Sequence, residues 1–184
     1  MSVNASNNKL DILAPNFNLR SIDNQYYKLN NLLGTNGTVV AFICNHCPYV
    51  IKIIDKFVFE AEELKKIGIS TIAIMSNDTI SYPEDSFENM ILFAKKFNFT
   101  FPYLYDASQN TARAYNAVCT PDIFGFNRYS LLKYRGRLNS DIKQNNINTK
   151  RELFYAMELI SKTNSGPKKQ FNSFGCSIKW AKNE

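Results

Sequence analysis

The chain has 184 residues, of which 45% are hydrophobic and 21% charged, a balance that is typical of a globular protein and excludes a disordered chain. Its length predicts one domain that buries a substantial core without disulfides. The net charge of +6 comes from Lys and Arg residues that are scattered along the chain, apart from pairs such as Lys65-Lys66, so we expect a solvated surface and no nucleic-acid partner.

The first ten residues are polar and lack the basic and then apolar order of a signal peptide. No apolar run is long enough to span a membrane, so no membrane partner is expected. The sequence therefore predicts a cytoplasmic protein. Thiols are kept reduced in the cytoplasm, where a cysteine pair is more often catalytic or metal-binding than a structural crosslink.

A β-hairpin is predicted near the beginning of the domain. Apolar residues alternate over 17–22 as in a strand, and Asp23-Asn24 supplies turn residues before a second strand at 26–28. A short helix is expected at 29–33, where Gly34 stops it.

A strand–helix–strand unit follows. Residues 38–43 are apolar almost throughout, as in a strand that is covered on both faces. Apolar residues then recur at helical spacing, which predicts an amphipathic helix over about 47–66 that ends before Gly68. Pro48 fits the first turn of that helix, because its missing N–H is not needed there. A second buried strand is predicted at 69–75, so the crossover should be right-handed.

The remaining elements alternate along the chain. We expect a polar loop at 77–85, followed by a helix with an apolar face from Met90 to Phe97 and a strand at 101–105. A helix capped by Asp106 should run to about 115, before strands at 123–126 and 131–134. An exposed polar stretch is expected at 138–148, and a last helix should begin near Thr149.

Three parts of the chain are predicted: a loose lead-in at 1–13, the domain at 14–163 and a C-terminal tail at 164–184. Ile178 and Trp180 make the tail too apolar to be idle solvent-exposed chain. We therefore expect the tail to pack back on the domain.

A C-x-x-C stands where the first buried strand gives way to the helix. Unpaired N–H groups and the positive end of the helix dipole favour an anion there, which lowers the pKa of a thiol from about 8.5. His46, the only histidine in the sequence, lies between Cys44 and Cys47. As an imidazolium it would stabilise the thiolate of Cys44.

Three interpretations of this pair compete. Two buried structural thiols are one, because free cysteine is commonly buried. A zinc half-site is another, but zinc needs a second pair at comparable spacing, whereas Cys119 and Cys176 stand alone and far apart. A C-x-x-C beside a strand–helix–strand pattern favours the third, a redox dithiol. We therefore predict no metal and no cofactor.

Six motifs together resemble those of one family. They are FICNHCPYV at 42–50, YPEDS at 82–86, FPYLYD at 101–106, AVCTPD at 117–122, YRGR at 134–137 and GCSIKW at 175–180. Over residues 14–180 the chain is similar to the peroxiredoxin-like proteins of the alkyl hydroperoxide reductase and thiol-specific antioxidant (AhpC/TSA) superfamily. The resemblance implies a thioredoxin-like α/β fold, with a central mixed β-sheet flanked by helices and an N-terminal β-hairpin.

The resemblance also implies roles for residues outside the C-x-x-C. Pro121 would be a cis-proline that faces the dithiol, and Thr120 would offer backbone groups to a bound peptide or partner protein. Cys119 would lie near the dithiol, with burial as a small apolar residue favoured over a redox role. Arg135 or Arg137 would supply the positive charge that a peroxide site needs, unless it is an ordinary surface residue.

Two positions depart from the related families. Thioredoxins carry a buried Asp about six residues before the first cysteine, where this chain has Thr38, so the usual proton acceptor for the second thiol is missing. Peroxiredoxins carry a Thr three residues before the peroxidatic cysteine. If Cys47 is the equivalent cysteine, that position is Cys44, and a hydroxyl donor has become a thiol. These departures favour dithiol exchange over peroxide reduction.

The sequence thus predicts a thiol–disulfide oxidoreductase that acts on a protein or small-molecule disulfide. Cys44, expected to be the more exposed thiol, attacks as a thiolate, and Cys47 resolves the mixed disulfide. An unidentified thiol or thioredoxin-type donor would reduce the pair. Two alternatives stay open: a thiol peroxidase in which Cys47 is peroxidatic and Cys44 resolves it, and a non-enzymatic redox-sensing or structural module. Cys176 is an accessory candidate, a third redox thiol if the tail is needed for turnover and not for stability.

Overall fold

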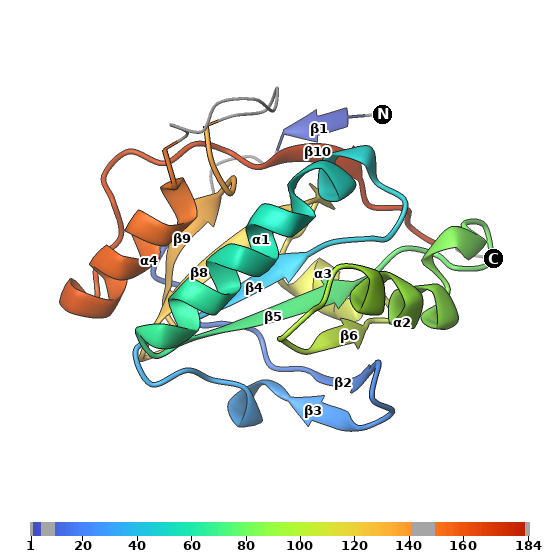
Figure 1. The fold of residues 1–184 in the computed structure, drawn as a ribbon, viewed down its shortest axis with the longest axis horizontal. Coiled ribbons are helices and arrows are strands. Elements are labelled where there is room, and N and C mark those ends of the chain that lie inside the picture. Colours follow the sequence, from blue (N-terminus) through green and yellow to red (C-terminus); the bar gives the residue numbers. More distant parts are fainter. Residues whose placement is uncertain (1, 5–9, 141–149, 183–184) are drawn as a thin grey trace.

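A seven-stranded mixed sheet forms the centre of the computed structural model, which describes residues 2–4, 10–140 and 150–182 (Figure 1). The strands are β2 (Asn18–Ser21), β3 (Tyr26–Lys28), β4 (Gly37–Phe42), β5 (Ile69–Met75), β6 (Tyr103–Tyr105), β8 (Asp122–Asn127) and β9 (Leu132–Gly136). They lie in the order β3-β2-β6-β5-β4-β8-β9. β5 pairs parallel with β4 and β6, and the other neighbours pair antiparallel.

Helices cover both faces of this sheet. They are α1 (Pro48–Lys66), α2 (Phe87–Lys96), α3 (Asn110–Ala114) and α4 (Glu152–Thr163), with short 3-10 helices at Leu29–Asn31 and Pro83–Asp85. Apolar residues of α1, α2 and α4 pack with Val39 and Ala41 of β4 on one face. Ala112 of α3 and the following Tyr115 pack with Val40 on the other face.

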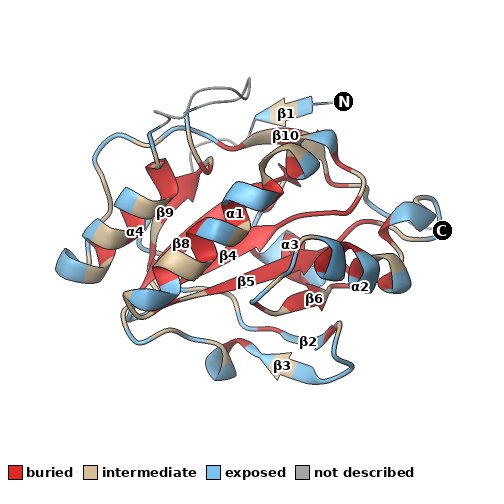
Figure 2. Ribbon diagram, in the orientation of Figure 1, coloured by how far each residue is buried: buried red, intermediate tan, exposed pale blue. Residues whose placement is uncertain are grey.

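β4 is enclosed on all sides, because β5 and β8 pair with its two edges and helices pack on both faces of the sheet. All six residues of β4 are buried, as the apolar run in the sequence predicts (Figure 2). α1 has its apolar residues at helical spacing, and it begins at Pro48 and ends at Lys66, as predicted. β5 agrees with the predicted strand at 69–75. These three elements are the frame on which the C-x-x-C is held.

A second, three-stranded sheet joins the two ends of the chain. Its strands are β1 (Ser2–Asn4), β7 (Cys119–Thr120) and β10 (Phe174–Ser177), in the antiparallel order β1-β10-β7. The prediction of a loose lead-in at 1–13 is therefore wrong for β1, whose backbone pairs with β10. Residues 5–9 lie outside the described residues.

The C-terminal tail packs on the domain, as predicted. Ile178 is buried in the cluster formed by α3 and its side of the sheet. Trp180 is 37% exposed and lies under the guanidinium of Arg113, whose carbon is 4.4 Å from the ring centroid. None of the described helices is both long enough and apolar enough to cross a membrane.

Two of the predicted helices begin later in the chain than expected. The helix expected from Asp106 begins at Asn110, because the Asp106 carboxylate reaches across a turn to accept the N–H groups of Thr111 and Ala112. The last helix begins at Glu152. Its predicted start near Thr149 and most of the polar stretch at 138–148 lie outside the described residues. The boundary between the domain and the tail stays a prediction.

Candidate redox site

The register of the sheet brings the C-x-x-C against the segment before β8. Phe42 at the end of β4 pairs with Asp122, so the chain beyond each strand end meets the other. The Thr120–Pro121 peptide bond is cis, as the resemblance implies. Cys44 Sγ lies 3.3 Å from Thr120 Oγ1, and the Cys47 thiol donates to the Thr120 carbonyl oxygen at 3.1 Å. Both sulfurs therefore face the residue before the cis-proline.

Both thiols are buried. Cys44 is 1% exposed and Cys47 0%. The prediction that Cys44 is the more exposed thiol is wrong, because the segment at 119–121 and the C-terminal tail close over the dithiol. α1 begins at Pro48, so Cys47 is the residue at its N-terminus and its carbonyl oxygen accepts the N–H of Ile51 at 2.9 Å. The positive end of the helix dipole therefore acts mainly on Cys47.

The two thiols differ in acidity. Hydrogen bonds from the Cys44 thiol, and next from the Cys176 thiol and Thr120, lower the pKa of Cys47 to about 5 against the effect of burial. The bond from Cys47 to the Thr120 carbonyl exists only in the thiol form and also opposes this shift. The pKa of Cys44 is raised, because it is the donor to Cys47, is buried and lies near the carboxylate of Asp85. The expectation that Cys44 carries the thiolate is corrected: Cys47 is the more acidic thiol.

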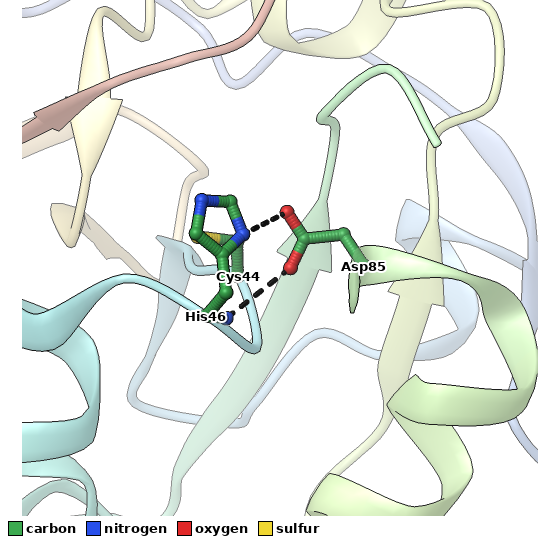
Figure 3. A group of neighbouring side chains, drawn as sticks. All are labelled: Cys44, His46 and Asp85. Atoms are coloured by element: carbon green, nitrogen blue, oxygen red, sulfur yellow. Dashed lines mark hydrogen bonds and ion pairs between the residues drawn. The ribbon is translucent and has the colours of Figure 1, made fainter. Parts of the chain in front are cut away.

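Asp85 is a residue of this site for which the sequence indicated no role. Its side chain is fully buried, and four donors surround it. Oδ1 accepts the backbone N–H groups of Asn45 at 2.8 Å and His46 at 3.3 Å. Oδ2 lies 2.7 Å from His46 Nδ1 (Figure 3). The Asn77 side-chain nitrogen donates to the same oxygen at 2.7 Å. The YPEDS motif was a signal for Asp85, but it does not show which residue faces the dithiol.

His46 is held between this carboxylate and an aromatic ring. Its ring stacks on Tyr82 with centroids 5.8 Å apart and an interplanar angle of 4°. A ring nitrogen of His46, an Asp85 oxygen and the Cys44 sulfur all lie within 4.8 Å of one another. Asp85 offsets any positive charge on the imidazole, so His46 is not the isolated cation that the sequence suggested. Its influence on Cys44 stays a prediction.

The same three residues offer a sulfur, a nitrogen and an oxygen to a metal ion. Both oxygens of Asp85 already accept two hydrogen bonds each, however, so a metal would have to replace existing bonds. This arrangement is fully explained as a hydrogen-bonded His–Asp pair. The absence of a metal cofactor remains a prediction.

The backbone of Thr120 already pairs with another strand of the same chain. β10 pairs antiparallel with β7, so that Cys176 lies opposite Thr120. Gly175 allows this close approach, because a Cβ there would lie 2.0 Å from the Thr120 carbonyl oxygen. The prediction that Thr120 offers its backbone to a bound peptide or partner protein is therefore corrected for this edge, whereas a binding role for Pro121 stays a prediction. Cys176, half-buried, is placed there instead, with its thiol hydrogen-bonded to Cys47.

The other accessory candidates have partners of their own. Cys119 is fully buried, and burial raises its pKa, which agrees with a role as a small apolar residue. Arg135 donates to Asp122 at 2.6 and 3.2 Å inside the protein. Arg137 donates to Glu152 at 2.7 and 3.0 Å. Both arginines thus have carboxylate partners of their own, which does not favour either as the cation of a peroxide site.

A buried strand that ends in a C-x-x-C, a helix that begins at the second cysteine and a cis-proline opposite the pair define a thioredoxin-like fold with a dithiol at its centre. The thioredoxin domain of a thiol-disulfide oxidoreductase from Bacteroides vulgatus has this fold as well. It aligns with a TM-score of 0.59 and 10% identity, over 70% of this chain and 89% of that one. The chain belongs to the AhpC/TSA family, whose model matches residues 12–140.

Two solved structures are similar over nearly the whole chain. An uncharacterized conserved protein from Geobacillus kaustophilus is 38% identical with a TM-score of 0.95, covering 100% of this chain and 98% of that one. A hypothetical protein from Sinorhizobium meliloti is 31% identical with a TM-score of 0.92, covering 98% and 99%. No curated protein matches the sequence. The comparisons confirm the predicted family and fold.

Proposed function

We propose that this protein is a thiol–disulfide oxidoreductase in which Cys44 and Cys47 cycle between a dithiol and a disulfide. Members of the AhpC/TSA family are oxidoreductases that act through thiols. The observation that carries the proposal is the placement of both sulfurs against Thr120 before the cis-proline, with Cys44 Sγ 3.3 Å from its Oγ1 and Cys47 Sγ 3.1 Å from its carbonyl oxygen. Two thiols held against the same residue need little movement to form a disulfide.

The Cys47 thiolate is the attacking group in this proposal. It attacks one sulfur of a substrate disulfide, forms a mixed disulfide and expels the other sulfur as a thiolate. Cys44 then loses its proton and attacks the Cys47 sulfur, which releases the second substrate thiolate. The net result is a Cys44–Cys47 disulfide and a substrate reduced by two electrons. This order reverses the one predicted from the sequence, because Cys47 has the lower pKa.

Release of the Cys44 proton is the step that needs help. The negative charge on Cys47 contributes to the raised pKa of Cys44, and that charge disappears when Cys47 enters the mixed disulfide. The His46–Asp85 pair lies within 4.8 Å of the Cys44 sulfur and supplies a nearby proton acceptor. It would take the place of the acidic residue that related proteins carry at the position of Thr38.

Peroxide reduction is a second candidate, and one observation favours it. A fully buried cysteine at a helix N-terminus with a pKa near 5 suits a small oxidant better than a bulky one. The Cys47 thiolate would attack one peroxide oxygen, break the O–O bond and become a sulfenic acid, with water or an alcohol as the other product. Condensation with Cys44 would release water and give the same disulfide.

A comparison of two oxidants tests the proposal. The reduced protein is mixed with a stoichiometric small disulfide or with hydrogen peroxide, quenched and alkylated, and the cysteines are identified by mass spectrometry. In Cys44→Ser/Cys176→Ser, which lacks both thiols next to Cys47, disulfide exchange predicts a mixed disulfide on Cys47, and in Cys47→Ser it predicts none on Cys44. Cys119→Ala is the matched control and should react as wild type.

The outcomes separate the alternatives. A stable sulfenic acid at Cys47 in Cys44→Ser/Cys176→Ser, formed faster by peroxide than the mixed disulfide is by a disulfide, would make the protein a peroxidase. Lack of any Cys44–Cys47 disulfide in Cys176→Ser with either oxidant would leave only a structural module. Insulin reduction in the presence of dithiothreitol then shows whether a protein disulfide is accepted. The cytoplasmic location and the identity of the electron donor remain predictions.

A further inference from the structure

We propose that Cys176 is a third redox thiol, which takes over the disulfide from Cys44 so that the oxidised protein exchanges a Cys44–Cys47 bond for a Cys47–Cys176 bond. This inference rests on the proposed function, because it needs the Cys44–Cys47 disulfide as its starting point. It extends that function by assigning the thiol through which electrons from a donor enter the buried site.

Strand pairing places Cys176 beside Cys47. β10 runs past the beginning of α1, and its residue Cys176 is the Cα partner of Thr120 (Figure 1). The carbonyl oxygen of Thr120 is the one that lies 3.1 Å from Cys47 Sγ. The thiols of Cys47 and Cys176 are close enough that each shifts the pKa of the other. Cys47 thus lies between two thiols, Cys44 from its own loop and Cys176 from the tail.

The tail is held firmly enough to keep this placement. Phe174 at the beginning of β10 packs edge-on against Tyr49 in the first turn of α1, with ring centroids 5.0 Å apart. Beyond β10, the Lys179 N–H donates to the Asn77 side-chain oxygen at 2.9 Å, and the Lys179 carbonyl accepts from Asp78. Asn77 in turn contacts Asp85. Cys176 is therefore anchored to the dithiol loop on both sides.

Exposure distinguishes Cys176 from the dithiol. Cys44 and Cys47 are at most 1% exposed, whereas Cys176 is only half-buried. A bulky donor has no direct access to the sulfurs of the Cys44–Cys47 disulfide. A Cys47–Cys176 disulfide presents the Cys176 sulfur toward solvent, where a donor thiolate can attack it.

The exchange is an internal rearrangement that needs no added oxidant. The Cys176 thiolate attacks the Cys47 sulfur, the new Cys47–Cys176 bond forms and the Cys44–Cys47 bond breaks. The electron pair of the broken bond stays on Cys44, which takes up a proton equivalent to the one that Cys176 lost. A donor thiolate then attacks Cys176, forms a mixed disulfide with it and releases Cys47 as a thiolate. Cys47 is a good leaving group, because its pKa is low.

The charge on Cys47 controls when Cys176 becomes reactive. Burial and then the neighbouring Cys47 raise the pKa of Cys176 to about 11, while Lys179 lowers it. In the reduced protein Cys176 therefore stays a thiol that donates to Cys47. When Cys47 enters a disulfide its negative charge is lost, so the pKa of Cys176 falls and its thiolate becomes available. The relay begins only after the dithiol is oxidised.

Removal of Cys44, the thiol that competes with Cys176 for Cys47, tests the inference. Full-length Cys44→Ser is oxidised with a stoichiometric diazene dicarboxamide, alkylated and digested without reductant, and its disulfides are identified by mass spectrometry. We expect a Cys47–Cys176 disulfide as the main product, equally in Cys44→Ser/Cys119→Ala. A free Cys176 thiol beside an oxidised Cys47 would overturn the inference. Formation of Cys44–Cys47 in Cys176→Ser, measured in parallel, shows separately whether the proposed function stands.

A second measurement tests the role in turnover. Oxidised wild type and Cys176→Ser are reduced either by dithiothreitol or by a thioredoxin-type protein dithiol, and the free thiols are counted over time. The variant should react about tenfold more slowly with the protein donor and nearly as wild type with dithiothreitol. Ser177→Ala, one residue along β10, is the matched control and should show no change. Equal rates for wild type and Cys176→Ser with the protein donor would contradict the relay.

Discussion

The carboxylate of Asp85 lies 2.7 Å from Nδ1 of His46, and both groups lie within 4.8 Å of the Cys44 sulfur. This contact links two segments that are 39 residues apart in the chain. The pair places one negative and one potentially positive group beside the same thiol. The two groups should therefore shift the pKa of Cys44 in opposite directions.

Substitution of either partner should shift the pKa of Cys44 by about one unit. Asp85→Asn removes a charge that raises the pKa, so the pKa should fall. His46→Ala leaves the buried carboxylate without its ring partner, so the pKa should rise. Thiolate absorbance against pH, recorded in the Cys47→Ser background, measures both. Glu84→Gln, an exposed neighbour, is the control, and shifts of the same sign in the two variants would contradict the account.

The reduced protein should show a thiolate at unusually low pH. Because the pKa of Cys47 is lowered to about 5, the ultraviolet absorbance of the thiolate should rise through about pH 5 and disappear below it. Cys44→Ala removes the first hydrogen bond to Cys47, so the midpoint should move up toward that of an ordinary thiol. Cys47→Ser should lose the transition. A wild-type midpoint near that of free cysteine, about 8.5, would show that Cys47 is not the acidic thiol.

The buried ion pair between Arg135 and Asp122 should matter for stability rather than for chemistry. The two side chains are 5% and 0% exposed, so Asp122→Ala leaves an uncompensated buried charge and should cost about 3–5 kcal/mol of unfolding free energy. Denaturant unfolding measures this cost. Glu158→Ala removes the partner of Lys162 in an exposed pair and should cost no more than about 1 kcal/mol. Similar costs for the two variants would mean that Asp122 is not held as described.

The tail should contribute to stability through Ile178. This side chain is 3% exposed in the apolar cluster, so Ile178→Ala should cost about 2–5 kcal/mol. Trp180→Ala, which removes a side chain that is 37% exposed, should cost less. Removal of the chain after Gly166 should destabilise the protein at least as much as Ile178→Ala. An unchanged melting temperature in the truncated protein, with turnover lost, would assign the tail to chemistry alone.

Local sequence patterns predicted the frame of the site. Helical periodicity gave α1 to within one residue, and β4 and β5 followed from apolar runs that are buried on both faces. Such elements are encoded by neighbouring residues. The position of the C-x-x-C at a strand-to-helix junction was therefore predictable without the structure.

Contacts between distant segments were not predictable in the same way. The antiparallel pairing of Cys176 with Thr120 joins the C-terminal tail to a segment in the middle of the chain, and a strand of four residues carries too little pattern to fix its partner. The burial of Cys44 likewise depends on the fold, which packs it in the core and against Thr120. The sequence indicated no role for Asp85, because its partners His46 and Asn77 come close to it only in the folded protein. The order of attack proposed for the two cysteines differs from the one predicted from the sequence for the same reason.

The pairing of thiols under a defined redox potential tests the central claim most directly. Full-length Cys176→Ser, in which the disulfide cannot pass on to the tail, is equilibrated in dithiothreitol buffers of increasing oxidised fraction, quenched with acid and alkylated, and each cysteine is quantified by mass spectrometry. The account predicts that Cys44 and Cys47 lose their free thiols together in a single two-electron transition, while Cys119 stays reduced throughout. Cys44 and Cys47 that remain alkylatable in every buffer, or that are lost at different potentials, would contradict it.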